Sequence, residues 1–450
     1  MIAYWIMASS NYSLCLLNGQ AMIGNQLVST NIYVEKGEIA LISDKKLEAT
    51  EIIDCTNLIV LPGVIDSQVH FREPGLEGKE TLSSGMLAAV AGGVTSIFEM
   101  PNTNPLTITP ETIEDKLSRA SKAPWSDYAF YLGGTMRTSK NLSKWENIKG
   151  VCGIKIFMGA STGDLMTATD EEVEAVVANG KRVIAVHAED EFLMNENKKT
   201  ILKDSNDVGM HCKWRDVNSS LNATKRVVGL AKKHNRHVHV LHITTSDEMD
   251  FLRQNKDTAT VEVLPNHLTL SAPDCYEELG TLAQQNPPIR EKHHQEALWR
   301  AIDDGTVDIV ASDHAPHTLD EKSQTYPKSP SGTPGVQTLV PIMLNHVNNG
   351  KLTLPKLVSL WSYGPERIHK ILNKGRIKEG YDADFTIVDM NKEMVIQNSQ
   401  QRSKSKWTPY DGLKVKGWVT HTILRGNCVM QDDEILSEPL GQMIKFKETI

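Results

Sequence analysis

The sequence has few cysteines, no excess of positive charge and no long apolar run. Its six cysteines are scattered without a CxxC pair, which favours free thiols in a reducing compartment over disulfides or a sulfur-based metal site. Lys and Arg (48) are outnumbered by Asp and Glu (56), so we expect no binding to nucleic acid or to anionic lipid. No apolar run could cross a bilayer, so we expect a cytoplasmic protein that acts on a small molecule.

The N-terminal segment MIAYWIMA is apolar, but it lacks the preceding basic residues and the following small-residue cleavage site of a secretory signal. We therefore predict a strand there. With 450 residues, 40% of them hydrophobic, the chain can bury a large core. We expect one large domain with a smaller one attached.

The middle of the chain alternates short apolar runs with helical patterns, which is typical of a parallel α/β architecture. The runs cover residues 60–66, 94–99, 127–133, 152–158, 182–187, 237–242, 259–264 and 307–312. Helical patterns begin between them, at Thr81, at Asp170 and at Leu298 for example. Eight such units predict an α/β fold, a (β/α)₈ barrel of the TIM type, over residues 60–379.

The two ends of the chain differ from the middle. Residues 1–59 and 380–450 are rich in strand patterns, with turns at Gly37, Gly380 and Gly426. We predict that both ends fold together into one small β-sandwich domain beside the barrel.

Polar residues follow the apolar runs at the points where barrel strands end. They are Gln68, His70, Asn102, Lys155, His187, His242 and Asp313. A single histidine at a strand end is more often structural than metal-binding. Because the carboxyl ends of barrel strands meet at one rim, however, three imidazoles, a carboxylate and a lysine there together predict a metal-dependent site.

Lys155 lies inside the apolar run IKIF, where an ammonium group is costly to bury unless it is paired or altered. One interpretation is that its side chain extends out of the barrel end to water. The other, which we favour beside His187 and His242, is that CO₂ converts the amine into a carbamate whose oxygens bridge two cations.

The remaining histidines in these segments have a structural interpretation. His237 and His239 share one face of their strand and are predicted to be structural. The pair His293 and His294 follows a helical pattern and is predicted to lie at the surface. His314, between two site candidates, is predicted to support the fold.

Seven ordered segments resemble the dihydroorotase family of the amidohydrolase superfamily, from about residue 61 to residue 426. They are QVHFREPG (68–75), EMPNT (99–103), GIKIFMG (153–159), VHAE (186–189), LHIT (241–244), NPPIR (286–290) and SDHAPH (312–317). The resemblance implies reversible cyclisation of N-carbamoyl-L-aspartate to (S)-dihydroorotate, a step of pyrimidine biosynthesis, by attack of metal-bound hydroxide on a cyclic amide.

The resemblance also implies two Zn²⁺ ions per chain. The implied ligands are His70, Lys155, His187, His242 and Asp313, with Gln68 standing where the family pattern has a further histidine. Asp313 would in addition carry the proton between the attacking hydroxide and the ring nitrogen. Because an amide binds zinc less readily than imidazole does, the first metal site is expected to be the weaker one.

The substrate-binding residues come from the same resemblance. Arg72, Asn102 and His317 would bind the substrate carboxylate, which needs several hydrogen-bond donors. Asn286 and the loop at Ser331 and Gly332 would contact the ring amides.

Two alternatives stay open. Allantoinase and other cyclic amidohydrolases share the metal-binding pattern. Gln68 also allows an inactive, dihydroorotase-like partner of aspartate transcarbamoylase. The resemblance further leaves open whether the chain forms a homodimer.

Overall fold

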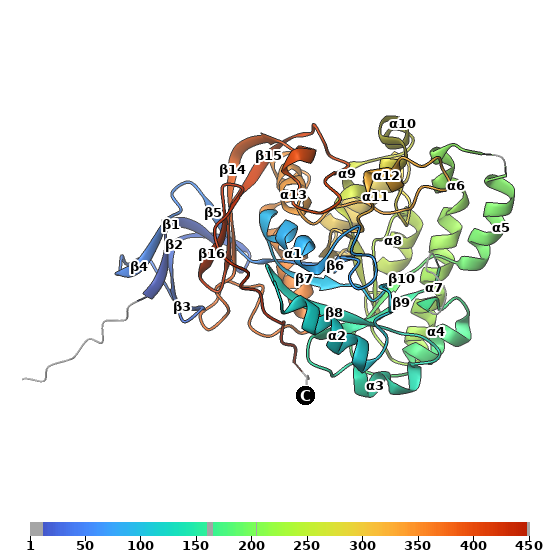
Figure 1. Cartoon of the computed structure of the whole chain (residues 1–450), viewed down its shortest axis with the longest axis horizontal. Helices are drawn as coiled ribbons and strands as arrows, with labels where there is room; N and C mark the ends of the chain where they lie inside the picture. Colours follow the sequence, from blue (N-terminus) through green and yellow to red (C-terminus); the bar gives the residue numbers. More distant parts are fainter. Residues whose placement is uncertain (1–11, 160–164, 204, 448–450) are drawn as a thin grey trace, which may run out of the picture.

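The computed structural model describes residues 12–159, 165–203 and 205–447, which form a barrel and a separate sheet (Figure 1). The N-terminal strand predicted for residues 1–8 lies outside these residues. Among the described residues, none of the helices has the length and apolar character to span a membrane.

The barrel is a parallel sheet of eight strands in sequence order. They are β6 (Val64–Val69), β7 (Val94–Glu99), β8 (Asp127–Gly133), β9 (Val151–Phe157), β10 (Ile184–His187), β11 (Val238–Val240), β12 (Ala259–Val263) and β13 (Ile309–Val310). A parallel bridge between Val69 and His314 joins the first strand to the segment after the last. The predicted (β/α)₈ barrel is thus confirmed.

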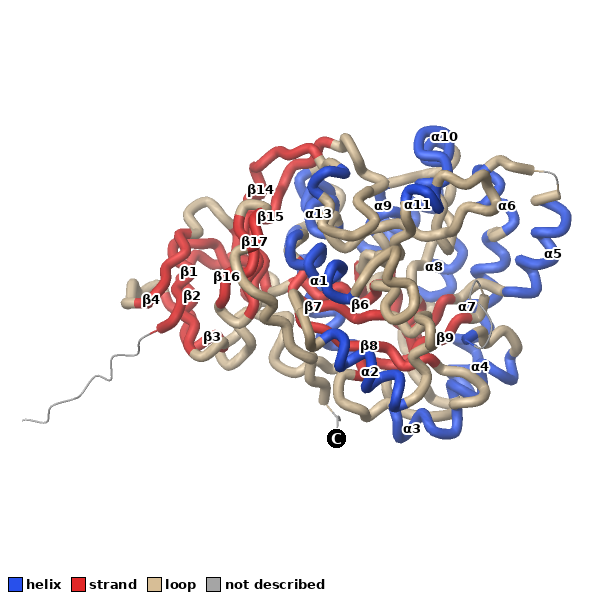
Figure 2. Tube along the Cα trace, viewed as in Figure 1, coloured by secondary structure: helices blue, strands red, loops and turns tan. Residues whose placement is uncertain are grey.

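Helices surround the barrel strands (Figure 2). They are α1 (Leu82–Ala91), α2 (Pro110–Ala120), α3 (Leu142–Trp145), α4 (Asp170–Val177), α5 (Glu191–Ile201), α6 (His211–Trp214), α7 (Val217–Lys233), α8 (Ser246–Arg253), α9 (Pro265–Thr269), α10 (Asp274–Leu279), α11 (Lys292–Asp303), α12 (Leu319–Lys322), α13 (Leu339–Asn348), α14 (Leu354–Val358) and α15 (Gly364–His369). The predicted helix starts at Thr81 and Asp170 are accurate because capping boxes at Thr81 and Thr169 fix them.

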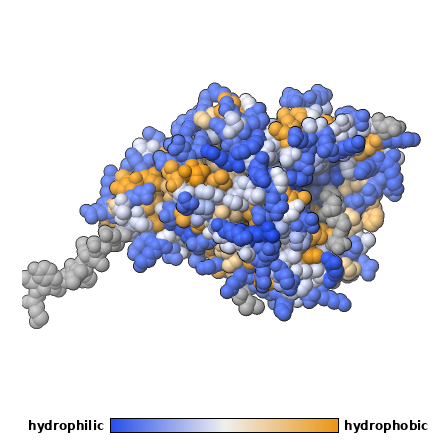
Figure 3. Space-filling view, in the orientation of Figure 1, coloured by the Kyte–Doolittle hydropathy of each residue, from blue (hydrophilic) through white to orange (hydrophobic). Residues whose placement is uncertain are grey.

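Strands from both ends of the chain form the second, mixed sheet. They are β1 (Tyr12–Ile23), β2 (Gln26–Glu35), β3 (Glu38–Ser43), β4 (Ala49–Asp54), β5 (Ile59–Pro62), β14 (Phe385–Val395), β15 (Lys414–Leu424), β16 (Asn427–Gln431) and β17 (Glu434–Ile435). The two halves meet where β5 pairs antiparallel with β14. In Figure 3, hydrophobic atoms gather over this part of the visible face, whereas most of the rest is hydrophilic.

The apolar run at residues 60–66 does not form one strand, as the sequence predicts, but two. Gly63 separates β5, which belongs to the mixed sheet, from β6, the first barrel strand. A Cβ atom at Gly63 would lie 2.4 Å from Oγ1 of Thr95 and 3.0 Å from Cβ of Asp384, so only glycine fits between the two parts.

Adjacent residues of the barrel strands face different cores. In β7, Ile97 packs in the large cluster between strands and helices, whereas Phe98 joins a cluster with Tyr131 and Ala185 inside the barrel. This alternation fills the lower barrel with apolar side chains. Polar side chains occupy its upper end, where the strands terminate.

Candidate active site

A polar cavity of about 80 Å³ opens at the carboxyl ends of the barrel strands. Its lining comes from strands β6, β9 and β10, the segments after β11 and β13, and two loops: Gln68, His70, Arg72, Lys155, Phe157, His187, His242, Asn286, Asp313, Ala315, Ser331 and Gly332. The predicted residues Asn102 and His317 lie outside this lining, and each contacts a lining residue. The fold thus gathers the residues singled out from the sequence.

Asp313 is contacted by Gln68 of β6 and by His70, which follows β6. Its Oδ1 atom accepts a hydrogen bond from Nε2 of Gln68 at 3.0 Å and lies 3.2 Å from Nε2 of His70. Nδ1 of His70 is 2.7 Å from Oδ1 of Asn102. Burial lowers the pKa of His70, with Asp313 opposing, so the ring is neutral. If Nδ1 donates to Asn102, the Nε2 lone pair faces the Asp313 carboxylate.

His187 and His242 form a second pair of imidazoles. Nδ1 of His187 is 3.1 Å from Nε2 of His242, and its Nε2 donates to Oε2 of Glu189 at 2.7 Å. Burial lowers the pKa of both histidines. Since Glu189 takes the proton-bearing nitrogen of His187, the lone pair on Nδ1 is directed at the other ring.

Glu189 was not assigned a role from the sequence. Burial would raise the pKa of its carboxyl, but Arg215 and His187 outweigh burial and hold that pKa well below its usual range. Arg215 binds both carboxylate oxygens of Glu189. The signal in the sequence was its spacing of two residues from His187, which places it on the same side of the chain.

Three of the residues that line the cavity have backbone angles in the left-handed region. The φ angles are 66° at Arg72, 39° at His242 and 47° at Asp313. Non-glycine residues adopt this region rarely, and such strain is frequent at functional sites. The turn at His242 ends the alternation of its strand.

Lys155 lies wholly inside the barrel and its Nζ atom has no hydrogen-bond partner. The ammonium nitrogen is 4.4 Å from the centre of the Phe157 ring. Burial lowers the pKa of Lys155 to about 7, although Asp313 and Glu262 oppose this shift. Its side chain therefore does not extend to water.

A layer of buried polar groups lies beneath the cavity. Burial raises the pKa of Asp66 to about 7, and burial together with Asp313 raises that of Glu262 to about 8. Nε2 of His239 lies 3.5 Å from Oε2 of Glu262. Sequence reasoning missed both acids, although a carboxylate in the apolar strand ATVEV is a detectable signal.

Arg72 and His317 lie together on the side of the cavity where we expect the substrate carboxylate to bind. Arg72 is buried, and its Nε donates to the carbonyl oxygen of Pro316 at 3.1 Å. Nε2 of His317 lies 3.1 Å from the Ser331 carbonyl oxygen, and Nδ1 lies 3.1 Å from Nζ of Lys79. A carbonyl only accepts and an ammonium only donates, so the neutral ring carries its proton on Nε2.

Asn286 also lines the cavity, and its Oδ1 accepts a hydrogen bond from Nε2 of His211 at 2.9 Å. Burial lowers the pKa of His211 to about 3, so its ring is neutral and holds the Asn286 side chain in place. Sequence reasoning missed His211, which lies in a polar segment without a strand-end signal.

Three buried polar atoms in the cavity indicate that it could hold a metal ion. Nζ of Lys155, Nδ1 of His242 and Oε1 of Gln68 are buried without a hydrogen-bond partner. Unsatisfied buried polar groups cost free energy and are rare, so a cluster of them calls for a ligand. Donors suited to a divalent metal ion such as zinc are the neutral imidazoles of His70, His187 and His242 and the carboxylate of Asp313.

Two other histidine assignments have different outcomes. His294 is buried, not at the surface as predicted, because Nδ1 accepts a hydrogen bond from the backbone nitrogen of Ser246. His314 packs inside, where Nδ1 accepts from the backbone nitrogen of Gly335 and Nε2 pairs with Glu80.

A cluster of acids elsewhere does not offer a comparable site. Asp127, Asp382 and Asp384 have ligand atoms within 4.8 Å of one another. Nζ of Lys374 pairs with all three, and Arg425 also pairs with Asp127. The lysine ammonium thus occupies the place that a cation would take.

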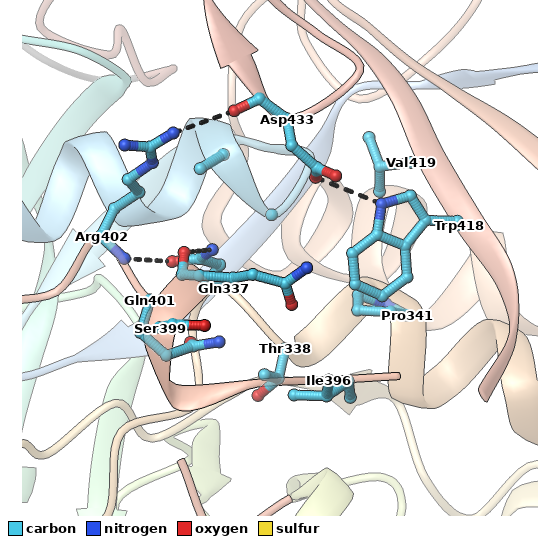
Figure 4. A pocket seen from close by; sticks show the side chains of 13 residues that line it. Gln337, Thr338, Pro341, Ile396, Ser399, Gln401, Arg402, Trp418, Val419 and Asp433 are labelled. Atoms are coloured by element: carbon cyan, nitrogen blue, oxygen red, sulfur yellow. Dashed lines mark hydrogen bonds between the residues drawn. The ribbon is translucent and has the colours of Figure 1, made fainter. Parts of the chain in front are cut away.

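A second cavity of about 230 Å³ lies between α1, α13 and the mixed sheet (Figure 4). Its polar groups are bonded to each other: Nε1 of Trp418 donates to Asp433, and the Arg402 backbone nitrogen donates to Gln337. Although larger, it lacks the converging imidazoles and carboxylates of the barrel cavity.

The sequence matches the model of the family described as "Amidohydrolase family" over residues 59–429. The dihydroorotase of Pyrococcus abyssi is 36% identical over 433 residues, which cover 95% of this chain and 98% of the relative. The dihydroorotase of Methanosphaera stadtmanae is 34% identical over 92% of this chain and 95% of the relative.

Solved structures with a similar fold include hydantoinases. L-hydantoinase (dihydropyrimidinase) from Arthrobacter aurescens superposes with a TM-score of 0.92 and 28% sequence identity, covering 96% of this chain and 99% of that chain. A D-hydantoinase with 23% identity and a TM-score of 0.88 supports the fold. The chain belongs to the amidohydrolase family.

Proposed function

We propose that this protein is a dihydroorotase, which interconverts (S)-dihydroorotate and N-carbamoyl-L-aspartate. The observation that carries the proposal is the buried guanidinium of Arg72 in the same cavity as the imidazoles and Asp313. A buried cation beside a hydrolytic centre favours a cyclic amide that bears a carboxylate over an uncharged one. The full-length similarity to archaeal dihydroorotases supports the same substrate.

We further propose that the cavity binds two Zn²⁺ ions. His187, His242 and Lys155 as a carbamate would hold one; Lys155, His70 and Asp313 would hold the other, with Gln68 as a weak additional ligand. The lowered pKa of Lys155, about 7, supports the carbamate, because the neutral amine is the form that reacts with CO₂. When bound, the ions would lower the pKa of water and stabilise negative charge on the amide oxygen.

Asp313 would act as the proton shuttle. In hydrolysis its carboxylate accepts the proton of the attacking water and delivers it to the ring nitrogen as the amide bond breaks. The hydrogen bond from Gln68 and the adjacent His70 keep Oδ1 of Asp313 directed into the cavity. In the biosynthetic direction the same group takes the proton from the carbamoyl nitrogen.

The remaining residues would bind and orient the substrate. Arg72 would pair with the carboxylate, with Asn102 and His317 completing that side. Asn286 and the backbone at Ser331 and Gly332 would contact the ring amides, which fixes the carbonyl carbon relative to Asp313.

One observation favours a second candidate function. Gln68 occupies a position where the family pattern has a metal ligand, and its amide donates to Asp313 instead. A chain with an incomplete metal centre would serve as an inactive partner, of aspartate transcarbamoylase for example. Independently of this alternative, the active enzyme could form a homodimer.

Hydrolysis of dihydroorotate by the purified protein, followed as loss of ultraviolet absorbance, separates the two candidates. Metal content is measured on the same sample. Turnover that depends on the metal supports the enzyme. No turnover at full metal content would leave the partner role, to be tested by co-purification with aspartate transcarbamoylase.

A further inference from the structure

Lys322, the last residue of α12, is a fully buried lysine behind the wall of the cavity. Its Nζ atom donates to three backbone carbonyl oxygens: Gln284 at 3.0 Å, Pro330 at 3.0 Å and Gly332 at 3.1 Å. These bonds use all three hydrogens of the ammonium group. Lys322 therefore ties α12 to two separate segments of the chain.

Two of the three carbonyls belong to the loop that faces the substrate. Ser331 and Gly332 line the cavity. The backbone nitrogen of Gly332 donates to the Gln284 carbonyl at 2.9 Å, and Nε2 of Gln284 donates to Oγ of Ser331 at 3.1 Å. Lys322 and Gln284 thus hold the same loop, one with a charged group and the other with a neutral one.

The charge of Lys322 is not balanced by an acid. The residues that the structure describes give it no ion pair, and the centre of the Trp407 ring lies 5.8 Å from Nζ. The other lysine on this side, Lys79, pairs with Glu321 at 2.8 Å. Burial lowers the pKa of Lys322 to about 7, and an anion bound nearby would favour the ammonium form over the neutral amine.

The positive charges on this side of the cavity act on His317. Burial, followed by Arg72, Lys79 and Lys322, lowers the pKa of His317 to about 2. His317 is therefore neutral, and Arg72 and the ammonium form of Lys322 carry the positive charge next to it. A buried unbalanced charge is costly in the empty site and is relieved when an anion binds nearby.

We propose, on the basis of the function proposed above, that Lys322 is a specificity-determining residue. Its three hydrogen bonds position the Ser331–Gly332 loop, and its unpaired charge makes the cavity select ring carboxylates over neutral rings of the same shape. Lys322 acts through the backbone of Gly332 and does not touch the substrate.

The test compares two ligands that differ only in the carboxylate, orotate and uracil. Their dissociation constants are measured by calorimetry on the metal-loaded protein. Lys322→Met removes charge and donors, Lys322→Gln removes the charge and keeps a donor, and Gln284→Leu weakens the loop without changing charge. We expect both lysine variants to lower the preference for orotate by about tenfold, because one unit charge is lost near the bound anion.

In Gln284→Leu we expect both ligands to bind more weakly by the same factor. An equal loss for both ligands in the lysine variants would reduce Lys322 to a structural role and overturn the proposal. Equal affinity of the wild-type protein for orotate and uracil would also overturn it. If Lys322→Met does not fold, as judged by circular dichroism, Lys322→Gln decides.

Dihydroorotate hydrolysis is measured in parallel on the same samples. Selective orotate binding without turnover would contradict the proposed function and leave the anion selectivity of Lys322 standing. Turnover without a preference for orotate would support the proposed function and contradict the selectivity proposed for Lys322.

Discussion

Gln68 donates a hydrogen bond from Nε2 to Oδ1 of Asp313 over 3.0 Å, so the amide faces the proposed proton shuttle with its nitrogen. Its oxygen, Oε1, is buried and has no hydrogen-bond partner. The side chain thus supports the carboxylate as a donor. The unpartnered oxygen leaves Gln68 able to act as the weak additional ligand proposed above.

This relationship predicts two metal sites of unequal strength. On stepwise chelation of the wild-type protein, we expect one ion to leave early and the other late, and added Zn²⁺, Mn²⁺ or Co²⁺ to raise activity. Gln68→His, which adds an imidazole, should tighten the weaker site by roughly tenfold. Metal content after each chelator step measures this. Simultaneous loss of both ions, in a protein indifferent to Gln68→Ala, would contradict the prediction.

Lys155→Ala should reduce activity by about a thousandfold, because the group proposed to link both metal sites is lost. Short carboxylates such as acetate should restore part of the activity by filling the space left by the side chain. The same carboxylates added to the wild-type protein serve as the control and should give no increase. Unchanged activity of the alanine variant without additive would rule out the carbamate.

Arg72→Lys should weaken dihydroorotate hydrolysis and leave the metal content unchanged. The guanidinium already donates to the Pro316 carbonyl through Nε, and a lysine cannot both keep that bond and pair with a carboxylate in a fork. We expect a loss of about 1.5 to 3 kcal/mol of transition-state stabilisation, read from kcat/KM. Faster turnover of allantoin than of dihydroorotate by the wild-type protein would favour an allantoinase.

Asp127→Asn should lower the free energy of unfolding by about 3 to 5 kcal/mol, because Arg425 would lose the acid it pairs with and Lys374 would lose one of its three acids. Asp382→Asn is the matched control; its side chain is 27% exposed, whereas that of Asp127 is fully buried, so we expect a smaller loss. Urea unfolding at neutral pH measures both. Equal losses would show that burial of the pair does not matter.

The same residue gives a dependence on pH with a definite sign. Burial would raise the pKa of Asp127, but Lys374 and Arg425 outweigh burial and hold it below the ordinary value of 3.8. A carboxyl whose pKa is lowered on folding stabilises the protein above the ordinary value, and this contribution is lost as the pH falls through the lowered pKa. Below pH 4, wild type should therefore lose more stability than Asp127→Asn does.

Much of the barrel was predictable because its strands are short apolar runs buried on both faces. The strands at 94–99 and 127–133 match their predicted bounds. The prediction of a single strand over residues 60–66 was wrong, because the apolar run continues across the boundary between the two sheets. Only the close approach of Thr95 and Asp384 to Gly63 reveals the break.

The part of the candidate site that lies at strand ends was predictable from the sequence. His187 and His242 follow apolar runs, so their convergence follows from barrel geometry. Glu189 and Glu262 were missed although each had a local signal in the sequence. Lys322 was missed because its partners, Gln284 and Gly332, lie in other segments. It lies in the polar segment LDEKSQ, which gives no indication of burial.

The pairing of β5 with β14 has a consequence for the order of events during synthesis. Ile59 pairs with Val388, so the N-terminal half of the mixed sheet leaves the ribosome long before its partner strand is translated. All eight barrel strands emerge in the interval. Until residues 385–388 appear, the edge of β5 lacks this partner and must be kept from pairing with strands of other nascent chains. We therefore expect a ribosome-bound chain stalled before residue 385 to depend on chaperones more than one stalled after residue 424.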